Sequence, residues 1–206
     1  MYNKFFSPLV IIITIGTLSF VCASSMLFDV QSKEAMAQTT DQSKNRSNSI
    51  NFLTYENPIF GIRMLYPANW DKQENTNSSN KNSTLTDLVT FGPQSNNRSD
   101  IAGKLIVKVD NISDIKPITL SENANDIIRD LRQDFKVAES TTTLAGLPTY
   151  KFEYTGTEES ADLQAMLLLT IKGDRAYIIS YTADPARYSS YLPTVQKMID
   201  SIQILK

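Results

Sequence analysis

The chain has 206 residues, of which 41% are hydrophobic and 20% are charged, and its formal net charge is -2. These proportions are those of an ordinary globular protein, and the weak negative charge offers no basic surface to nucleic acid. The sequence contains no histidine and one cysteine, which excludes Ser-His-Asp and Cys-His catalytic groups and ordinary zinc sites. We therefore predict a non-enzymatic protein with no catalytic residues, no metal site, no cofactor and no nucleic-acid partner.

Residues 1–37 have the pattern of an export segment, either a signal peptide or an N-terminal membrane anchor. Lys4 precedes a mainly apolar run over 5–21, and Ala35-Met36-Ala37 has the small-x-small form after which signal peptidases cut. We favour cleavage after Ala37, and an uncleaved anchor is the alternative because the apolar run nears the length that spans a bilayer. In either case we expect the rest of the chain outside the cytoplasm, secreted or anchored to the outer face of the cytoplasmic membrane.

Cys22 lies directly after the apolar run, in the place where an acylated lipoprotein cysteine would lie. The residue before it is Val21, where a small residue is expected, so lipidation is disfavoured. A lone cysteine cannot form an intramolecular disulfide, and the domain must be held together by packing alone.

Residues 38–50 are polar up to Ile50, and this composition predicts a linker before a domain at 51–206. The alternation over 62–66 predicts a strand that follows a turn at Gly61 and ends at Pro67.

Two polar segments, at 72–84 and 94–100, flank a short apolar run at 88–91. They predict long loops, or a hairpin with frayed ends. Residues 104–110 alternate between apolar and mostly charged side chains, which predicts a second, half-buried strand.

The clearest helix begins with a capping box formed by Thr119 and Glu122. Arg129 and Arg132 lie on the face expected to contact water. The apolar stripe on the other face consists of Leu120, Ala124, Ile127, Ile128, Leu131 and Phe135.

From Val137 onward the pattern predicts an antiparallel meander with turns at 146–148 and 173–174. The run Leu167-Leu168-Leu169 is apolar on both faces, so it suits a central strand with a helix on each side. A second helix begins at Asp184-Pro185, with Pro193 tolerated near its start. Its apolar stripe consists of Leu192, Val195, Met198, Ile199 and Ile202.

Four short motifs follow one another along the predicted domain. They are Tyr55-x-x-Pro58-x-x-Gly61-x-x-x-x-Tyr66-Pro67-x-x-Trp70, Ala145-Gly146-Leu147-Pro148-x-Tyr150, Arg175-Ala176-Tyr177 and Met198-Ile199-Asp200-Ser201-Ile202. In this order and spacing they resemble the PsbP-like domain, over residues 52–204. The resemblance implies an α/β (α+β) fold, an α/β/α sandwich with a central antiparallel sheet flanked by helices.

Members of this family in plants and cyanobacteria lie on the lumenal side of photosystem II and help to retain calcium and chloride at the oxygen-evolving centre. The resemblance therefore implies the role of an extrinsic accessory subunit, and many other relatives are exported proteins of unknown role. Histidine metal ligands of the family cannot exist in this chain. We carry over the fold and the extracytoplasmic placement, and not the photosystem role.

Several candidate sites have a simpler explanation. Two Ser-x-x-Lys matches, Ser78 with Lys81 and Ser113 with Lys116, lack the helix start that a Ser-Lys nucleophile needs. The acidic cluster Glu158, Glu159 and Asp162 lies in an expected hairpin connection, where carboxylates are normally solvated. Weak calcium binding is conceivable at Asp110, Asn111 and Asp114, but the glycine and terminal glutamate of a calcium loop are missing.

Two further candidates are glycosylation of the surface and a ring-binding face of strand aromatics. The five Asn-x-Ser/Thr sequons, little more than chance supplies, begin at Asn45, Asn77, Asn82, Asn97 and Asn111. We interpret the strand aromatics as core packing beneath a helix rather than as a ring-binding face. They are Tyr150, Phe152, Tyr154, Tyr177 and Tyr181.

The sequence thus predicts an exported accessory or binding module that docks on a protein partner in or at the membrane. The alternative is an exported domain that binds a small ligand, or a carboxylate-dependent hydrolase. A pocket lined by two or more facing carboxylates would favour the alternative, and a shallow apolar patch would favour the module.

Overall fold

The computed structural model describes residues 50–74, 85–94, 103–113, 118–158 and 161–205. They belong to one compact unit, Ile50–Lys206, and the boundaries of the predicted linker and domain stay predictions. The predicted export segment, with Cys22 and Ala37, lies outside the described residues, and so does the linker up to residue 49. Neither helix in the described part of the chain is both long and apolar enough to cross a membrane.

The described domain contains ten strands and two helices. In chain order they are β1 (Phe52–Asn57), β2 (Ile62–Pro67), β3 (Trp70–Glu74), β4 (Leu85–Pro93), β5 (Lys104–Asn111), α1 (Leu120–Asp134), β6 (Lys136–Leu144), β7 (Leu147–Glu158), β8 (Ala161–Lys172), β9 (Arg175–Ala183), α2 (Pro185–Asp200) and β10 (Gln203–Ile204).

Both helices begin at the predicted caps. The Thr119 hydroxyl accepts the backbone N–H of Glu122 at 3.2 Å, and the Glu122 carboxylate accepts the backbone N–H of Thr119 at 2.8 Å. In α2, the Asp184 carboxylate accepts the Ala186 N–H at 2.8 Å, and Pro185 occupies the first turn. These contacts satisfy backbone donors that the first turn of a helix leaves unpaired.

The strands form two antiparallel sheets. The larger has seven strands in the order β3-β4-β5-β9-β8-β7-β6, and the smaller has three in the order β1-β2-β10. The smaller sheet is tied to the larger one where the Tyr177 hydroxyl donates to the Phe60 carbonyl at 2.8 Å. The closing strand β10 was not predicted, because two residues are too few to show a period.

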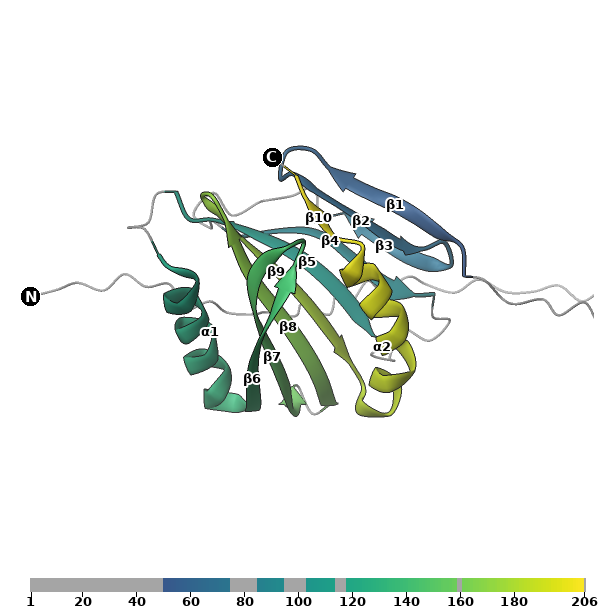
Figure 1. Ribbon diagram of the computed structural model, residues 1–206. Coiled ribbons are helices and arrows are strands. Elements are labelled where there is room, and N and C mark those ends of the chain that lie inside the picture. The colour runs from purple at the N-terminus through teal and green to yellow at the C-terminus, as the bar shows by residue number, and fades with distance from the viewer. Residues whose placement is uncertain (1–49, 75–84, 95–102, 114–117, 159–160, 206) are drawn as a thin grey trace, which may run out of the picture. The chain divides into compact units, whose positions relative to one another are not determined.

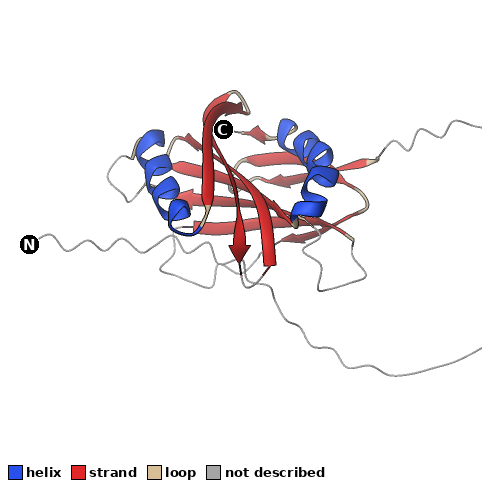
Figure 2. Cartoon of the chain, turned by 90° about the horizontal axis from the view of Figure 1, so that it is seen from below, coloured by secondary structure: helices blue, strands red, loops and turns tan. Residues whose placement is uncertain are grey.

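The seven-stranded sheet is a central layer with α1 on one face and α2 on the other (Figures 1 and 2). Met166 and Leu168 of β8 belong to the core cluster that contains Met198 of α2. Leu167 and Leu169 alternate with them and are buried on the α1 face. The doubly apolar strand is therefore covered on both sides, and the predicted α/β/α arrangement is confirmed.

Four local predictions were wrong. Glu158 and Asp162 belong to the paired ends of β7 and β8 rather than to a hairpin connection. Residues 72–74 belong to strand β3 rather than to a loop, so the hairpin alternative was the better one, with β3 paired to β4. The turn after β6 contains only Ala145 and Gly146, and Pro148 already lies in β7. Pro193 lies inside α2, because the helix starts eight residues earlier at Pro185.

Candidate functional site

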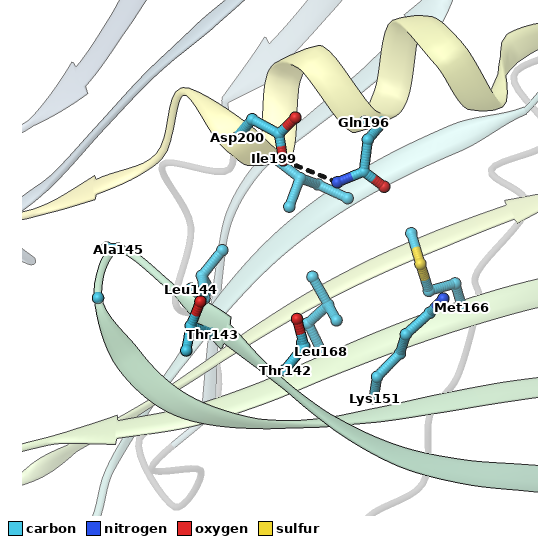
Figure 3. A pocket seen from close by; sticks show the side chains of 11 residues that line it. Thr142, Thr143, Leu144, Ala145, Lys151, Met166, Leu168, Gln196, Ile199 and Asp200 are labelled. Carbon is cyan, nitrogen blue, oxygen red and sulfur yellow. Dashed lines mark hydrogen bonds between the residues drawn. The ribbon is translucent and has the colours of Figure 1, made fainter.

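A groove of about 480 Å³ opens between the β6–β7 hairpin, β8 and the last turns of α2 (Figure 3). It lies on the α2 face of the large sheet, next to the helix. The lining residues are Thr142, Thr143, Leu144, Ala145, Gly146, Lys151, Met166, Leu168, Gln196, Ile199 and Asp200.

The floor of the groove is apolar and belongs to the core. Leu144, Met166, Leu168 and Ile199 are each at most 5% exposed, so their positions are fixed by packing from below. Because apolar burial stabilises by roughly 25 cal/mol per Å² removed from water, these nearly buried side chains shape the groove and add little binding energy of their own.

Polar side chains line the rim. The Lys151 ammonium lies 3.0 Å from the Glu153 carboxylate on the same strand, and both side chains remain in contact with water. Across the groove, the Gln196 amide donates to the Asp200 carboxylate at 2.8 Å, one helical turn apart. The rim therefore offers one ammonium, one carboxylate, an amide and two threonine hydroxyls to a bound group.

The shape of one end of the groove is set by a tight turn. Ala145 and Gly146 both have positive φ, 50° and 78°, as a two-residue hairpin turn of this hand requires. Gly146 supplies this conformation without cost, and Ala145 adopts it against its steric preference. The turn pairs Leu144 with Leu147, and Leu144 forms part of the floor.

Of the sequence-predicted acidic candidates, the structure describes the side chains of Asp162 and Asp110, and the side chains of Glu158, Glu159 and Asp114 lie outside the described residues. Asp162 accepts a hydrogen bond from the Thr157 hydroxyl at 2.9 Å across the β7–β8 hairpin, and it is exposed. Asn111 accepts the backbone N–H of Ser113 at 3.1 Å. Within the described ranges, no group of three or more acidic, histidine or cysteine side chains could hold a metal ion.

Several predicted positions lie outside the described residues: Glu159, Asp114, Ser78, Lys81, Lys116 and the sequons at Asn45, Asn77, Asn82 and Asn97. Asn111, which begins the fifth sequon, is described and exposed at the end of β5.

The prediction that the strand aromatics pack in the core is confirmed for four of the five. Phe152, Tyr154, Tyr177 and Tyr181 are at most 5% exposed, whereas Tyr150 is half-buried and stacked on Phe152 with ring centroids 6.3 Å apart.

The groove itself was not predicted from the sequence. Its floor and rim come from β6, β7, β8 and α2, which meet only in the fold. A weak pattern was available, because Lys151 and Glu153 alternate with the β7 aromatics and mark a strand face that a helix does not cover.

Comparisons with known proteins agree with this fold. The family model for PsbP-like proteins matches residues 9–204. The chain belongs to the PsbP-like family. The resemblance seen in the four motifs is thereby confirmed, although the match begins inside the predicted export segment, whose end at residue 37 stays a prediction.

Two solved structures show the PsbP-like fold at low sequence identity. One is cyanobacterial PsbP (CyanoP) from Synechocystis sp. PCC 6803, with 15% identity and a TM-score of 0.53 over 79% of this chain and 98% of that one. The other is LpqN of Mycobacterium tuberculosis, described as involved in cell envelope biogenesis, with 11% identity and a TM-score of 0.56 over 78% of this chain and 94% of that one. A comparison with functionally curated proteins gave no match.

Proposed function

We propose that this PsbP-like domain is an exported, non-enzymatic binding module, and that its groove docks a protein partner at the outer face of the membrane. The observation that carries the proposal is the composition of the groove. Among the described residues that line it, Asp200 is the single carboxylate, and the floor is apolar and rigidly packed.

A carboxylate-dependent hydrolase needs a second carboxylate facing the first across the substrate. Glu153, the nearest carboxylate by sequence to the groove residue Lys151, pairs with that lysine at 3.0 Å and does not line the groove. The composition instead suits a module that holds a partner mainly through the polar rim of threonines, Lys151, Gln196 and Asp200, above a floor fixed by packing.

Binding of a small ligand is the second candidate, and the volume of the groove favours it. About 480 Å³ falls in the range of about 300–1,000 Å³ typical of small-molecule pockets. Native mass spectrometry of the protein purified from its own membrane fraction separates the candidates. A bound small molecule that leaves on heating would support the ligand, and its absence would favour the protein partner.

The decisive test compares two variants of α2. Gln196→Trp places an indole in the groove, whereas Lys197→Trp places the same indole on the next residue, which is exposed and does not line the groove. After mild crosslinking of intact cells, we expect the wild-type chain and Lys197→Trp to capture the same membrane protein and Gln196→Trp to lose it. Equal capture by both variants would reject the groove as the docking site.

Export is tested separately. Mass spectrometry of the native protein should find a peptide that begins at Gln38 if the segment is cleaved after Ala37. Peptides that cross Ala37 in the mature pool would show the uncleaved anchor instead.

A further inference from the structure

Strand β6 is an open edge of the seven-stranded sheet. Among the described residues it pairs only with β7, in a register that runs from Lys136 to Leu144 without a shift. All its residues except Leu144 are exposed or half-buried. A partner strand can therefore reach this edge.

The hairpin turn determines which backbone groups face outward. A two-residue turn places Leu144 and Leu147 in a hydrogen-bonded pair, and hydrogen-bonded and non-hydrogen-bonded pairs then alternate along the strand. The N–H and C=O groups of the intervening residues point away from β7. These residues are Val137, Glu139, Thr141 and Thr143.

The opposite edge of the same sheet is built differently. β3 has only five residues, and its sequence Trp-Asp-Lys-Gln-Glu carries three charges, so it is short and charged, as protected edges are. β6 has nine residues with no proline, and between Ala138 and Thr143 its only charge is Glu139. Threonines 141–143 strongly favour extended structure.

The sequence of β6 is complementary to itself in one antiparallel register. We propose that β6 pairs with β6 of a second copy of the chain, with Ser140 opposite the partner's Ser140. Glu139 then lies opposite the partner's Thr141, and Val137 lies opposite the partner's Thr143. All four outward-facing residues of each copy are paired, and no two like charges face each other.

The two neighbouring registers of the β6–β6 pair are less favourable. A slip by one pair in one direction places Glu139 opposite the partner's Glu139, which brings two carboxylates together. A slip in the other direction places Val137 opposite the partner's Ala145, which has φ of 50° in the hairpin turn and has left the strand. The structure thus favours one register out of three.

This pairing goes beyond the proposed docking function, and it determines how the grooves of two copies lie relative to each other. The twofold axis of an antiparallel pair is perpendicular to the sheet, so both copies present their α2 faces on the same side. The two Lys151 residues would then be three strand spacings apart, about 14 Å. Two grooves would open side by side on one continuous sheet.

Single cysteines test the register. In the full-length chain carrying Cys22→Ala, Ser140→Cys would be the only thiol and would face its own copy across the twofold axis, in a non-hydrogen-bonded pair with Cβ atoms about 4.5–5.5 Å apart. Thr142→Cys, exposed on the same strand, would face the partner's Ala138 and lie about 14 Å from its own copy. Only the first distance is close to that of a disulfide.

With a mild oxidant, we expect a disulfide-linked dimer from Ser140→Cys and none from Thr142→Cys. A mixture of Ala138→Cys and Thr142→Cys chains should crosslink as well. Failure of Ser140→Cys to crosslink, or equal crosslinking of Ser140→Cys and Thr142→Cys alone, would overturn the proposal.

Sedimentation of the full-length chain gives an independent measurement. Thr141→Pro removes an outward-facing N–H that β7 does not use, so the hairpin should keep its own bonds. We expect a roughly twofold higher mass for the wild-type chain and Thr141→Val than for Thr141→Pro. A Thr141→Pro variant that melts like the wild type and still sediments as a dimer would contradict the pairing.

Discussion

The hydroxyl of Tyr181 donates a hydrogen bond to the backbone carbonyl of Tyr188 at 3.0 Å, and their ring centroids are 4.8 Å apart. The bond ties β9 to the first turns of α2. Both side chains are at most 3% exposed. Burial raises the pKa of Tyr181 above its ordinary value, and burial together with the nearby Glu153 carboxylate raises the pKa of Tyr188 to about 12.

We predict that the domain loses stability above pH 10. The protonated phenols are favoured in the folded state, so their contribution is fully present below the unfolded pKa of 10.0 and is lost as the pH rises through about 12. Each tyrosine should lower the free energy of unfolding by up to about 1.4 kcal/mol per pH unit in this window. Urea unfolding at a series of pH values measures the slope.

The matched control for this prediction is Tyr188→Phe, which keeps the ring and the backbone carbonyl and removes one titrating group. It should show a shallower decline between pH 10 and 12. An unchanged slope would show that other groups control the alkaline transition.

We predict opposite outcomes for two adjacent residues of α1. Ile128 is 5% exposed, so Ile128→Asp buries an unpaired carboxylate at a cost of several kcal/mol, comparable to the whole stability of a domain. Arg129 is exposed and pairs with Asp126 at 2.7 Å, so Arg129→Asp should cost less than about 1 kcal/mol. Thermal melts of the two variants measure the difference. Equal melting temperatures would show that the inward and outward faces of α1 are wrongly assigned.

Gly156 of β7 lies so close to an aromatic ring that adding a single methyl group should lower the stability of the domain. A Cβ at this position would lie 2.5 Å from Cδ1 of Phe135, whose ring packs on Tyr154 with centroids 5.1 Å apart. Gly156→Ala should therefore destabilise the domain by about 1–3 kcal/mol. The exposed neighbour Thr155→Ala should stay within about 0.5 kcal/mol of the wild type.

A double-mutant cycle identifies the cause of that cost. If the methyl group collides with the ring, Phe135→Leu combined with Gly156→Ala should destabilise less than the sum of the two single changes. Additive free energies of unfolding from denaturant titrations would assign the loss to the backbone of β7 instead.

We also predict that neither zinc nor manganese binds with useful affinity, and that any effect of calcium is weak. Calorimetry with each ion tests this. If a specific site exists, an ion at a concentration of about 100 times the dissociation constant would add about 2.7 kcal/mol to the free energy of unfolding. A thermal melt detects a change of that size easily. A stoichiometric site would revive the ion-retention role that the family resemblance implies.

The elements with strong periodicity were predictable from the sequence. Thr119 and Glu122 form the expected capping box, and Ala124, Ile127 and Leu131 are buried as the stripe predicted. These features depend on residues within a few positions of one another. Local pattern therefore determined α1 and the alternation of the meander.

β3 was missed because an exposed charged residue, Lys72, lies on the same strand face as the buried Trp70. Lys72 is paired with the buried Phe91, and its ammonium group lies 5.9 Å and 6.0 Å from the ring centroids of Tyr55 and Tyr66. A lysine that covers aromatic rings with its cation can replace an apolar residue at an edge, so the period-two pattern disappears. The groove was missed for a different reason, since Leu144 and Ile199 are brought together only by tertiary structure.

The pairing of β10 with β2 has a consequence for how the chain folds during synthesis. Gln203 lies opposite Arg63, so the third strand of the small sheet comes 140 residues after the strand that it joins (203 - 63 = 140). At about 5–20 residues per second, the β1–β2 hairpin emerges roughly 7–28 s before its last strand. Until then the hairpin has an unpaired edge and an uncovered apolar face, in the interval when a chaperone or a translocation machine can most easily bind it.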